Sequence, residues 1–300
     1  MTPMGDTALE TLLRRDRVIV VAALVTLTAI SWLYILWLAS AMDMARPPAP
    51  SASMDMGSGM DMDMPMDMPA DKPMTMGAQQ GAMASMAGAV AAPWSATTFA
   101  YALVMWAVMM VGMMVPSATP MILLYARVGR KAAQQGKPFA ATGFFAAGYL
   151  SAWILFALVA VLGQWLLDRA LLLTPALASA SAVLSGIVLI AVGLFQFTPL
   201  KDRCLSQCQA PLLFIQSHGG FRREAGGAFG LGVRHGLYCV GCCWALMALL
   251  FVGGVMNVLW IAAIAIFVLA EKVVPGGRIL SRIAGVALVL AGLWQLMALL

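Results

Sequence analysis

The amino-acid sequence predicts an all-α fold, a polytopic membrane bundle of about seven transmembrane helices with a disordered outer loop. Of the 300 residues, 62% are hydrophobic and only 10% are charged, whereas soluble domains carry about 25% charged residues. The apolar residues also fall in uncharged runs about as long as a membrane-spanning helix requires. These observations exclude an ordinary soluble protein and make the lipid bilayer an expected partner.

The first apolar run, residues 18–39, follows three arginines and contains no charged side chain. Because a helix rises about 1.5 Å per residue, this run is long enough to cross a hydrocarbon core of roughly 30 Å. The string Ala39-Ser40-Ala41 resembles a signal-peptide cleavage site, but the apolar part of a signal peptide is usually only about 7–15 residues long. We therefore expect residues 1–40 to form a cytoplasmic N-terminus and a retained first helix, with a cleaved signal peptide as the alternative.

Further apolar runs cover residues 99–125, 139–163, 176–197, 235–270 and 279–300. Pro116 is expected to kink or interrupt the helix at 99–125. The run at 235–270 is too long for one crossing, since it would form a helix of roughly 54 Å. Gly253, Gly254 and Asn257 offer a turn in its middle. We therefore expect two short helices there, and a six-helix metal-binding membrane domain over residues 98–300.

Basic residues test this count, because cytoplasmic loops are enriched in lysine and arginine. With the N-terminus inside, 15 of the 18 basic residues are cytoplasmic, and only Arg46, Lys72 and Arg169 lie outside. We expect a multi-pass protein of the bacterial inner membrane, with the N-terminus in the cytoplasm and the Met-rich loop and C-terminus in the periplasm. The basic residues form no continuous face, so nucleic acid is not an expected partner.

Methionine is concentrated in the expected outer loop, residues 41–97. Thirteen of the 24 methionines lie between Met42 and Met86, many in Met-x-Met repeats. The densest group is Met60, Met62, Met64, Met66 and Met68. Disordered segments are usually poor in large apolar residues, so a solvated linker alone does not explain this choice. Thioethers select Cu(I) and survive in an oxidising compartment, so the loop predicts copper capture, although silver would satisfy the same ligands.

A second group of methionines lies in the run at 99–125. Met105, Met109 and Met113 are spaced four residues apart, and Met110 and Met114 repeat that step beside them. In a helix this spacing places the thioethers on one broad face. Methionine also fills packing gaps, so packing is the alternative to metal ligation for this methionine stripe. The adjacent Met-rich loop favours ligation.

All five cysteines fall on the expected cytoplasmic side, where thiols stay reduced. Cys204 and Cys208 are four residues apart, and Cys239, Cys242 and Cys243 lie three to four residues apart, so each group shares one helix face. We expect two to four thiolates to bind one metal ion. The alternatives are cysteines buried without function and a membrane thiol-disulfide oxidoreductase that uses Cys239 and Cys242.

Three ionisable residues at the ends of apolar runs are given simple structural interpretations. His235 is expected to be a solvated interfacial histidine, with an accessory-ligand role as the alternative. Glu271 and Lys272 are expected to form an interfacial pair at the end of the sixth span, with attraction of a cation or a proton relay by the acid as the alternative. The sequence contains no Ser/His/Asp set and no nucleotide-binding loop, so we expect a protein that is not an enzyme.

These motifs resemble a family of bacterial integral membrane proteins. The strings that carry the resemblance are Trp106-Ala107-Val108-Met109-Met110, Met114-Val115-Pro116-Ser117, Phe197-Thr198-Pro199-Leu200-Lys201, Cys239-Val240-Gly241-Cys242-Cys243-Trp244-Ala245-Leu246-Met247 and Glu271-Lys272. The family is known as a predicted metal-binding family and as domain of unknown function 2182, and its members are sometimes labelled copper chaperones. The resemblance covers roughly residues 99–300 and implies a metal-binding membrane protein.

The sequence therefore predicts a copper-handling protein that captures Cu(I) through periplasmic methionines and passes it to a cysteine site at the cytoplasmic face. Thiolates are anionic as well as soft and bind Cu(I) more strongly than thioethers, so the affinity gradient points towards uptake or delivery. The expected cofactor is copper as Cu(I). The expected recipient is a membrane enzyme or a soluble chaperone, and an accessory assembly subunit that supplies copper to a larger enzyme is a further alternative.

Overall fold

The computed structural model describes residues 6–44, 94–135, 142–170, 172–174 and 177–299. Apart from an isolated bridge between Leu173 and Ser179, every regular element in these residues is a helix. The helices are α1 (Asp6–Met44), α3 (Ala96–Gln134), α4 (Thr142–Arg169), α5 (Ala182–Phe195), α6 (Pro199–Gln209), α7 (Pro211–Ser217), α8 (Ala225–Ala248), α9 (Leu250–Gly253), α10 (Val258–Val273) and α11 (Gly277–Met297). The predicted all-α fold is confirmed.

Several helices are compatible with a multi-pass membrane protein. Five segments are long and apolar enough to cross a bilayer, namely Val18–Ala41, Ala96–Ala132, Thr142–Arg169, Ala225–Gly253 and Gly277–Met297. α5 and α6 meet at an angle of 64° and together make a sixth candidate. α10 has only 16 residues, fewer than the about 20 that a crossing needs. The structure therefore supports five or six spans, and the predicted count of seven is not confirmed.

The long apolar run at residues 235–270 is broken at the expected turn. Gly254 has a φ of 93°, a conformation that glycine adopts without steric cost. Asn257 caps α10, because its side-chain oxygen accepts a hydrogen bond of 3.2 Å from the backbone N–H of Trp260. Two helices, α8 and α10, therefore replace one overlong helix, as the sequence predicted.

The expected interruption at Pro116 does not occur, since α3 continues through Pro116 and Pro120. Proline lacks the N–H that would bond to the carbonyl four residues earlier, so the carbonyl oxygen of Gly112 loses its intrahelical partner. The indole Nε1–H of Trp32 on α1 donates a hydrogen bond of 3.3 Å to that oxygen. Packing against α1 thus compensates for the proline inside the helix.

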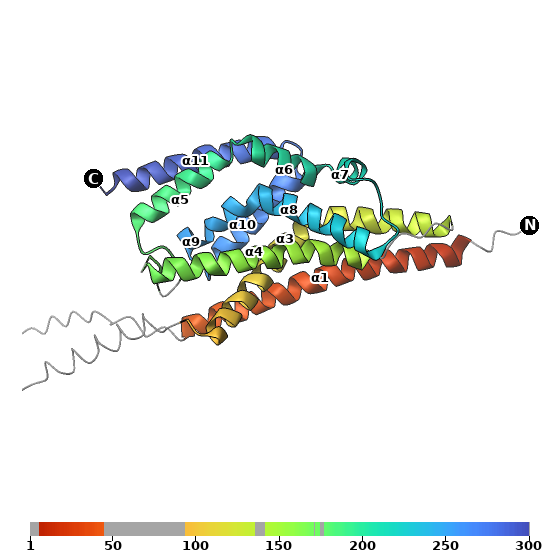
Figure 1. Cartoon of the computed structure of the whole chain (residues 1–300), viewed down its shortest axis with the longest axis horizontal. Coiled ribbons are helices and arrows are strands. Elements are labelled where there is room, and N and C mark those ends of the chain that lie inside the picture. Colours follow the sequence, from red (N-terminus) through yellow and green to blue (C-terminus); the bar gives the residue numbers. More distant parts are fainter. Residues whose placement is uncertain (1–5, 45–93, 136–141, 171, 175–176, 300) are drawn as a thin grey trace, which may run out of the picture.

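The core lies where α3, α4, α8 and α10 run side by side, with α1 along one edge and α5 beside α11 on the opposite side (Figure 1). α4 and α8 approach closely because glycines face the backbone of the other helix. A Cβ added at Gly236 would lie 2.6 Å from the Cβ of Ala152 and 3.0 Å from the carbonyl oxygen of Tyr149. This close approach sets the side chain of Tyr149 against α8.

Candidate metal centre

The two groups of cysteines meet inside the bundle, between α6 and the second half of α8. The Sγ atoms of Cys208 and Cys242 lie 4.0 Å apart. Cys204 packs against the backbone of α8, since a Cβ added at Gly241 would lie 2.8 Å from its Sγ. All five cysteines are free, and all except the partly exposed Cys208 are buried. The structure thus brings together two groups that are distant in the sequence.

Cys239 contacts two polar side chains inside the bundle. Its Sγ accepts a hydrogen bond of 2.8 Å from the Nζ of Lys272 and lies 3.2 Å from the hydroxyl of Tyr149. The same Nζ donates to the Oγ of Ser117 at 3.0 Å. An ammonium group at this distance stabilises negative charge on the sulfur, and the thiolate is the form of cysteine that binds metals.

The other two thiols of α8 point back along the helix. The Sγ atoms of Cys242 and Cys243 donate to the backbone carbonyl oxygen of Cys239, at 3.1 and 2.8 Å. The three thiols are therefore held within one helical turn, on the face of α8 that the bundle buries. They lie inside a candidate membrane span rather than beyond its end.

Met114 connects the methionine stripe to the thiols. Its Sδ lies 4.0 Å from the Sγ of Cys243, and its carbonyl oxygen accepts a hydrogen bond of 3.1 Å from the hydroxyl of Tyr149. The whole stripe is buried in the core: Met105, Met109, Met110, Met113 and Met114. Sequence reasoning singled out Met105, Met109 and Met113 as ligands, but the methionine that contacts a thiol is in the neighbouring row. Only the spacing between Met110 and Met114 pointed to it.

The sulfur pairs have a spacing that suits a bridging soft ion. Two metal–sulfur bonds of about 2.3 Å, the length found in zinc thiolate sites, enclose an angle of about 120° when they join sulfurs 4.0 Å apart. The sulfur atoms are 4.0 Å apart both in the pair Cys208–Cys242 and in the pair Cys243–Met114, so each pair can hold one ion with this geometry. Within the described ranges, no three His, Cys, Asp or Glu side chains form a ready metal cluster. The centre therefore offers pairs of sulfur ligands rather than a closed cage.

The helix that carries Cys204 and Cys208 starts at a defined cap. Thr198 accepts a hydrogen bond of 3.3 Å from the backbone N–H of Lys201, and Pro199 occupies the first turn. A threonine cap followed by proline is a strong signal for a helix start. The new helix direction points Lys201 into the bundle, where its side chain is fully buried.

Lys201 and Glu271 form a buried ion pair beside the thiols. The Nζ of Lys201 donates to both carboxylate oxygens of Glu271 at 2.9 Å, and their side chains are 0% and 2% exposed. The Oγ of Ser281 donates to the same carboxylate at 2.6 Å, and the Nε2 of Gln209 donates to the carbonyl oxygen of Glu271 at 2.7 Å. α6 is thus fastened to α10 near both of its ends, which holds Cys208 close to Cys242.

The structure corrects two interpretations from the sequence. Glu271 pairs with Lys201 rather than with its neighbour Lys272, which faces Cys239 instead. His235 is not solvated, since it is 3% exposed and lies among the rings of Phe145, Tyr149 and Phe214. The buried contacts of Lys201 and Lys272 were not predicted from the sequence, because a lysine beside an apolar run usually lies at the membrane interface.

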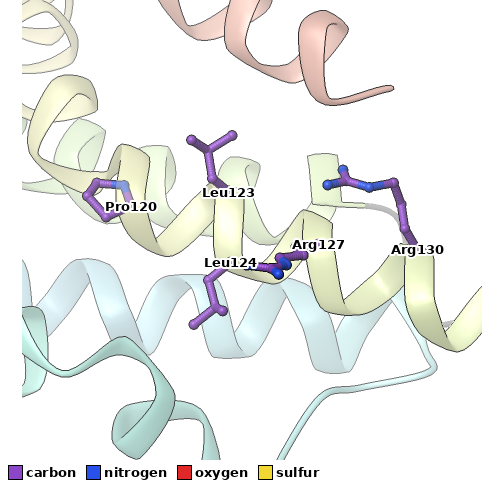
Figure 2. Close-up of a pocket in the computed structure, with 5 residues that line it drawn as sticks. All are labelled: Pro120, Leu123, Leu124, Arg127 and Arg130. Carbon is purple, nitrogen blue, oxygen red and sulfur yellow. The ribbon is translucent and has the colours of Figure 1, made fainter. Parts of the chain in front are cut away.

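A separate pocket lies near the end of α3, away from the sulfur ligands. It has a volume of about 540 Å³ and is lined by Pro120, Leu123, Leu124, Arg127 and Arg130 (Figure 2). Guanidinium groups beside apolar side chains suit an anionic headgroup rather than a soft cation. This pocket is therefore not part of the candidate metal centre.

The methionines of the expected outer loop, apart from Met42 and Met44 at the end of α1, lie outside the described residues. They include the candidate ligands Met60, Met62, Met64, Met66 and Met68. The described part of the site therefore consists of the methionine stripe, the thiols and the polar groups around Cys239.

A family model described as "PpoB2: Copper chaperone" matches residues 103–295. The matched segment contains the methionine stripe, all five cysteines and the ion pair, and it excludes the Met-rich loop. No curated protein and no solved structure matches the chain.

Proposed function

Because the chain belongs to the PpoB2 family of copper chaperones, we propose that it takes up Cu(I) through methionines and passes it to the thiols inside the helix bundle. Membership of the family supports copper handling in general, and the route and the ligands are our proposal. The observation that carries the route is the 4.0 Å contact between the Sδ of Met114 and the Sγ of Cys243. Through this contact the thioether stripe continues directly into the thiol cluster.

In this proposal the Met-rich loop, residues 41–97, collects copper on the periplasmic side. Its Met-x-Met repeats supply neutral soft ligands, and the aspartates between them attract cations. Residues 98–300 form the membrane domain that receives the ion. The distribution of basic residues favours an inner-membrane protein with a cytoplasmic N-terminus. A periplasmic C-terminus belongs to this proposal only if the short α10 counts as a seventh span.

The second step is transfer along α3. Met105, Met109 and Met113 follow one another at steps of four residues, about 6 Å along the helix axis, so an ion can exchange ligands in short steps. Met109, Met110, Met113 and Met114 are 1% exposed or less, which keeps the ion away from water. Neutral thioethers hold Cu(I) weakly, so no step along the stripe traps the ion.

The third step is capture by thiolates and delivery. The anionic sulfur atoms bind Cu(I) more strongly than thioethers, which gives the transfer its direction. Cys208 is the partly exposed member of the cluster, so we assign it the hand-over of copper to a recipient membrane enzyme or soluble chaperone. This role is that of a carrier of copper and not of an enzyme.

Rapid-mixing kinetics on the purified full chain test this route. We expect a variant with Met105, Met109 and Met113 changed to leucine to load Cu(I) onto the thiols at least about tenfold more slowly, while the affinity of the thiols stays unchanged. Met297→Leu changes an exposed methionine of α11 and serves as the control. Equal loading rates in the triple variant and the control would exclude the row of Met105, Met109 and Met113 from the route.

A thiol-disulfide oxidoreductase is the second candidate, and the 4.0 Å distance between Cys208 and Cys242 favours it. The sequence suggested Cys239 and Cys242 for this role, but Cys242 donates to the carbonyl oxygen of Cys239. Counting free thiols after treatment with oxidant and then reductant separates the two functions. A reversible disulfide without Cu(I) binding would favour the oxidoreductase.

An accessory subunit that supplies copper to a larger enzyme differs from a free-standing carrier in its partner. Isolation of a stable complex with a membrane enzyme would favour the subunit. Copper flux into liposomes that contain only this chain would favour the carrier.

A further inference from the structure

The thiol cluster contains one buried ammonium group that no carboxylate balances among the described residues. The side chain of Lys272 contacts the Sγ of Cys239 at 2.8 Å and the Oγ of Ser117 at 3.0 Å. The nearest acid in the sequence, Glu271, has both carboxylate oxygens occupied by Lys201.

The other helices around the cluster bring no further unpaired buried charge in the part of the chain that is described, since the buried Lys201 of α6 is paired with Glu271. α3 contributes Ser117 and Met114, α4 contributes Tyr149, and α8 contributes its three thiols and the imidazole of His235. On α6 and α11, Asp202 and Arg282 pair near the surface, with side chains 29% and 62% exposed. The positive charge of Lys272 must therefore be balanced by negative charge on the thiols and their bound ion.

This balance depends on the charge of the bound ion. Two thiolates and a monovalent ion carry one net negative charge, which the ammonium group of Lys272 neutralises. Two thiolates and a divalent ion are neutral and leave Lys272 as an uncompensated buried charge, which is strongly unfavourable. A third thiolate would restore neutrality for a divalent ion, but no three His, Cys, Asp or Glu side chains among the described residues are arranged so that they could hold one ion together.

We propose that Lys272 is a specificity-determining residue that makes the cluster select a monovalent soft ion, Cu(I) or Ag(I), held by two thiolates, over a divalent ion such as Zn(II). The inference rests on the proposed function, because it takes the thiol cluster to be the copper site. It adds a reason for selectivity that the sulfur ligands alone do not provide, since thiolates also bind Zn(II) well.

The test measures the affinities of the purified full chain for Cu(I), Ag(I) and Zn(II) by competition with chelators. Lys272→Gln keeps a hydrogen-bond donor near Cys239 and removes the charge, whereas Lys272→Arg keeps the charge. Because charges this close interact by more than a factor of ten in an equilibrium constant, we expect Lys272→Gln to lower the ratio of Cu(I) to Zn(II) affinity at least about tenfold. The ratio for Ag(I) to Zn(II) should fall in parallel, and Lys272→Arg should keep both ratios within about threefold.

Lys272→Leu is a second variant without the charge, so the test remains possible if Lys272→Gln does not fold. Unchanged ratios in a folded neutral variant would overturn the role of Lys272 and leave the copper site in place. If the wild type and a variant with all five cysteines changed to serine bind Cu(I) equally, the proposed function itself fails. The two failures are therefore distinguishable.

Discussion

Replacing Lys201 by leucine should destabilise the protein strongly, because it leaves the carboxylate of Glu271 buried without its cation. The two side chains are 0% and 2% exposed and the ion-pair distance is 2.9 Å, so water cannot replace the lost ammonium group. Breaking a buried pair of this kind costs about 3–5 kcal/mol in the free energy of unfolding. Because α6 is fastened through this pair, the thiols of Cys204 and Cys208 should also become more reactive.

The double variant Lys201→Leu, Glu271→Leu shows how much of the lost stability comes from leaving one charge buried without its partner. It removes both charges, and Ser281 retains a hydrogen bond of 3.1 Å to the carbonyl oxygen of Gly277. Since an apolar replacement of a buried pair is often neutral, we expect the double variant to be at least about 1 kcal/mol more stable than Lys201→Leu alone.

Chemical unfolding in detergent micelles, with alkylation rates of the cysteines as a local measure, checks both expectations. The exposed pair of Asp202 and Arg282, 3.7 Å apart, provides the control, because Asp202→Asn should change the stability by less than about 1 kcal/mol. The reasoning is wrong if Lys201→Leu costs no more than this control or if the double variant is less stable than the single one.

Three further predictions follow from the packing of the site. Gly236→Ala should lower the free energy of unfolding by about 1–3 kcal/mol, because a Cβ there would lie 2.6 Å from the Cβ of Ala152 on α4. Gly230→Ala is the control in the same unfolding assay. A Cβ at Gly230 meets nothing within 4 Å, so this change should be neutral or stabilising. Met114→Leu should change stability by less than about 1.5 kcal/mol and yet slow the loading of Cu(I) onto Cys243, so an unchanged loading rate would argue against the thioether–thiol contact. Cys208, as the partly exposed thiol, should be alkylated first and be protected by bound Cu(I); equal alkylation with and without copper, measured by mass spectrometry, would remove it from the site.

The helices could largely be predicted from the sequence because their signals are local. Uncharged runs set the long helices, and Gly254 and Asn257 marked the turn before α10 through backbone and capping preferences. Pro116 does not interrupt α3, and a long-range contact from Trp32 on α1 satisfies the freed carbonyl group; a kink, the other outcome expected there, stays a prediction. The number of membrane spans could not be predicted from the sequence. The apolar run that contains α10 is as compatible with a hairpin of two spans as with the short helix that the structure has.

The candidate site could be predicted only in part. The spacing of the cysteines placed each group on one helix face, but the meeting of α6 with α8 depends on packing that no local pattern specifies. The partner of Glu271 lies 70 residues away in the sequence, so the adjacent Lys272 was the more obvious choice. Because Lys201 pairs with the carboxylate of Glu271, Lys272 contacts Cys239 instead. This contact could not be predicted from the sequence around either lysine.

The most direct test of the central claim is the copper content of the purified full chain after exposure to Cu(I), compared with a variant in which all five cysteines are serine. X-ray absorption at the copper edge identifies the ligands in the same samples. We expect copper bound by sulfur in the wild type, and loss of the tightly bound copper in the variant. Undiminished tight binding in the variant, or copper bound by nitrogen and oxygen alone in the wild type, would contradict the claim that the thiols hold the ion.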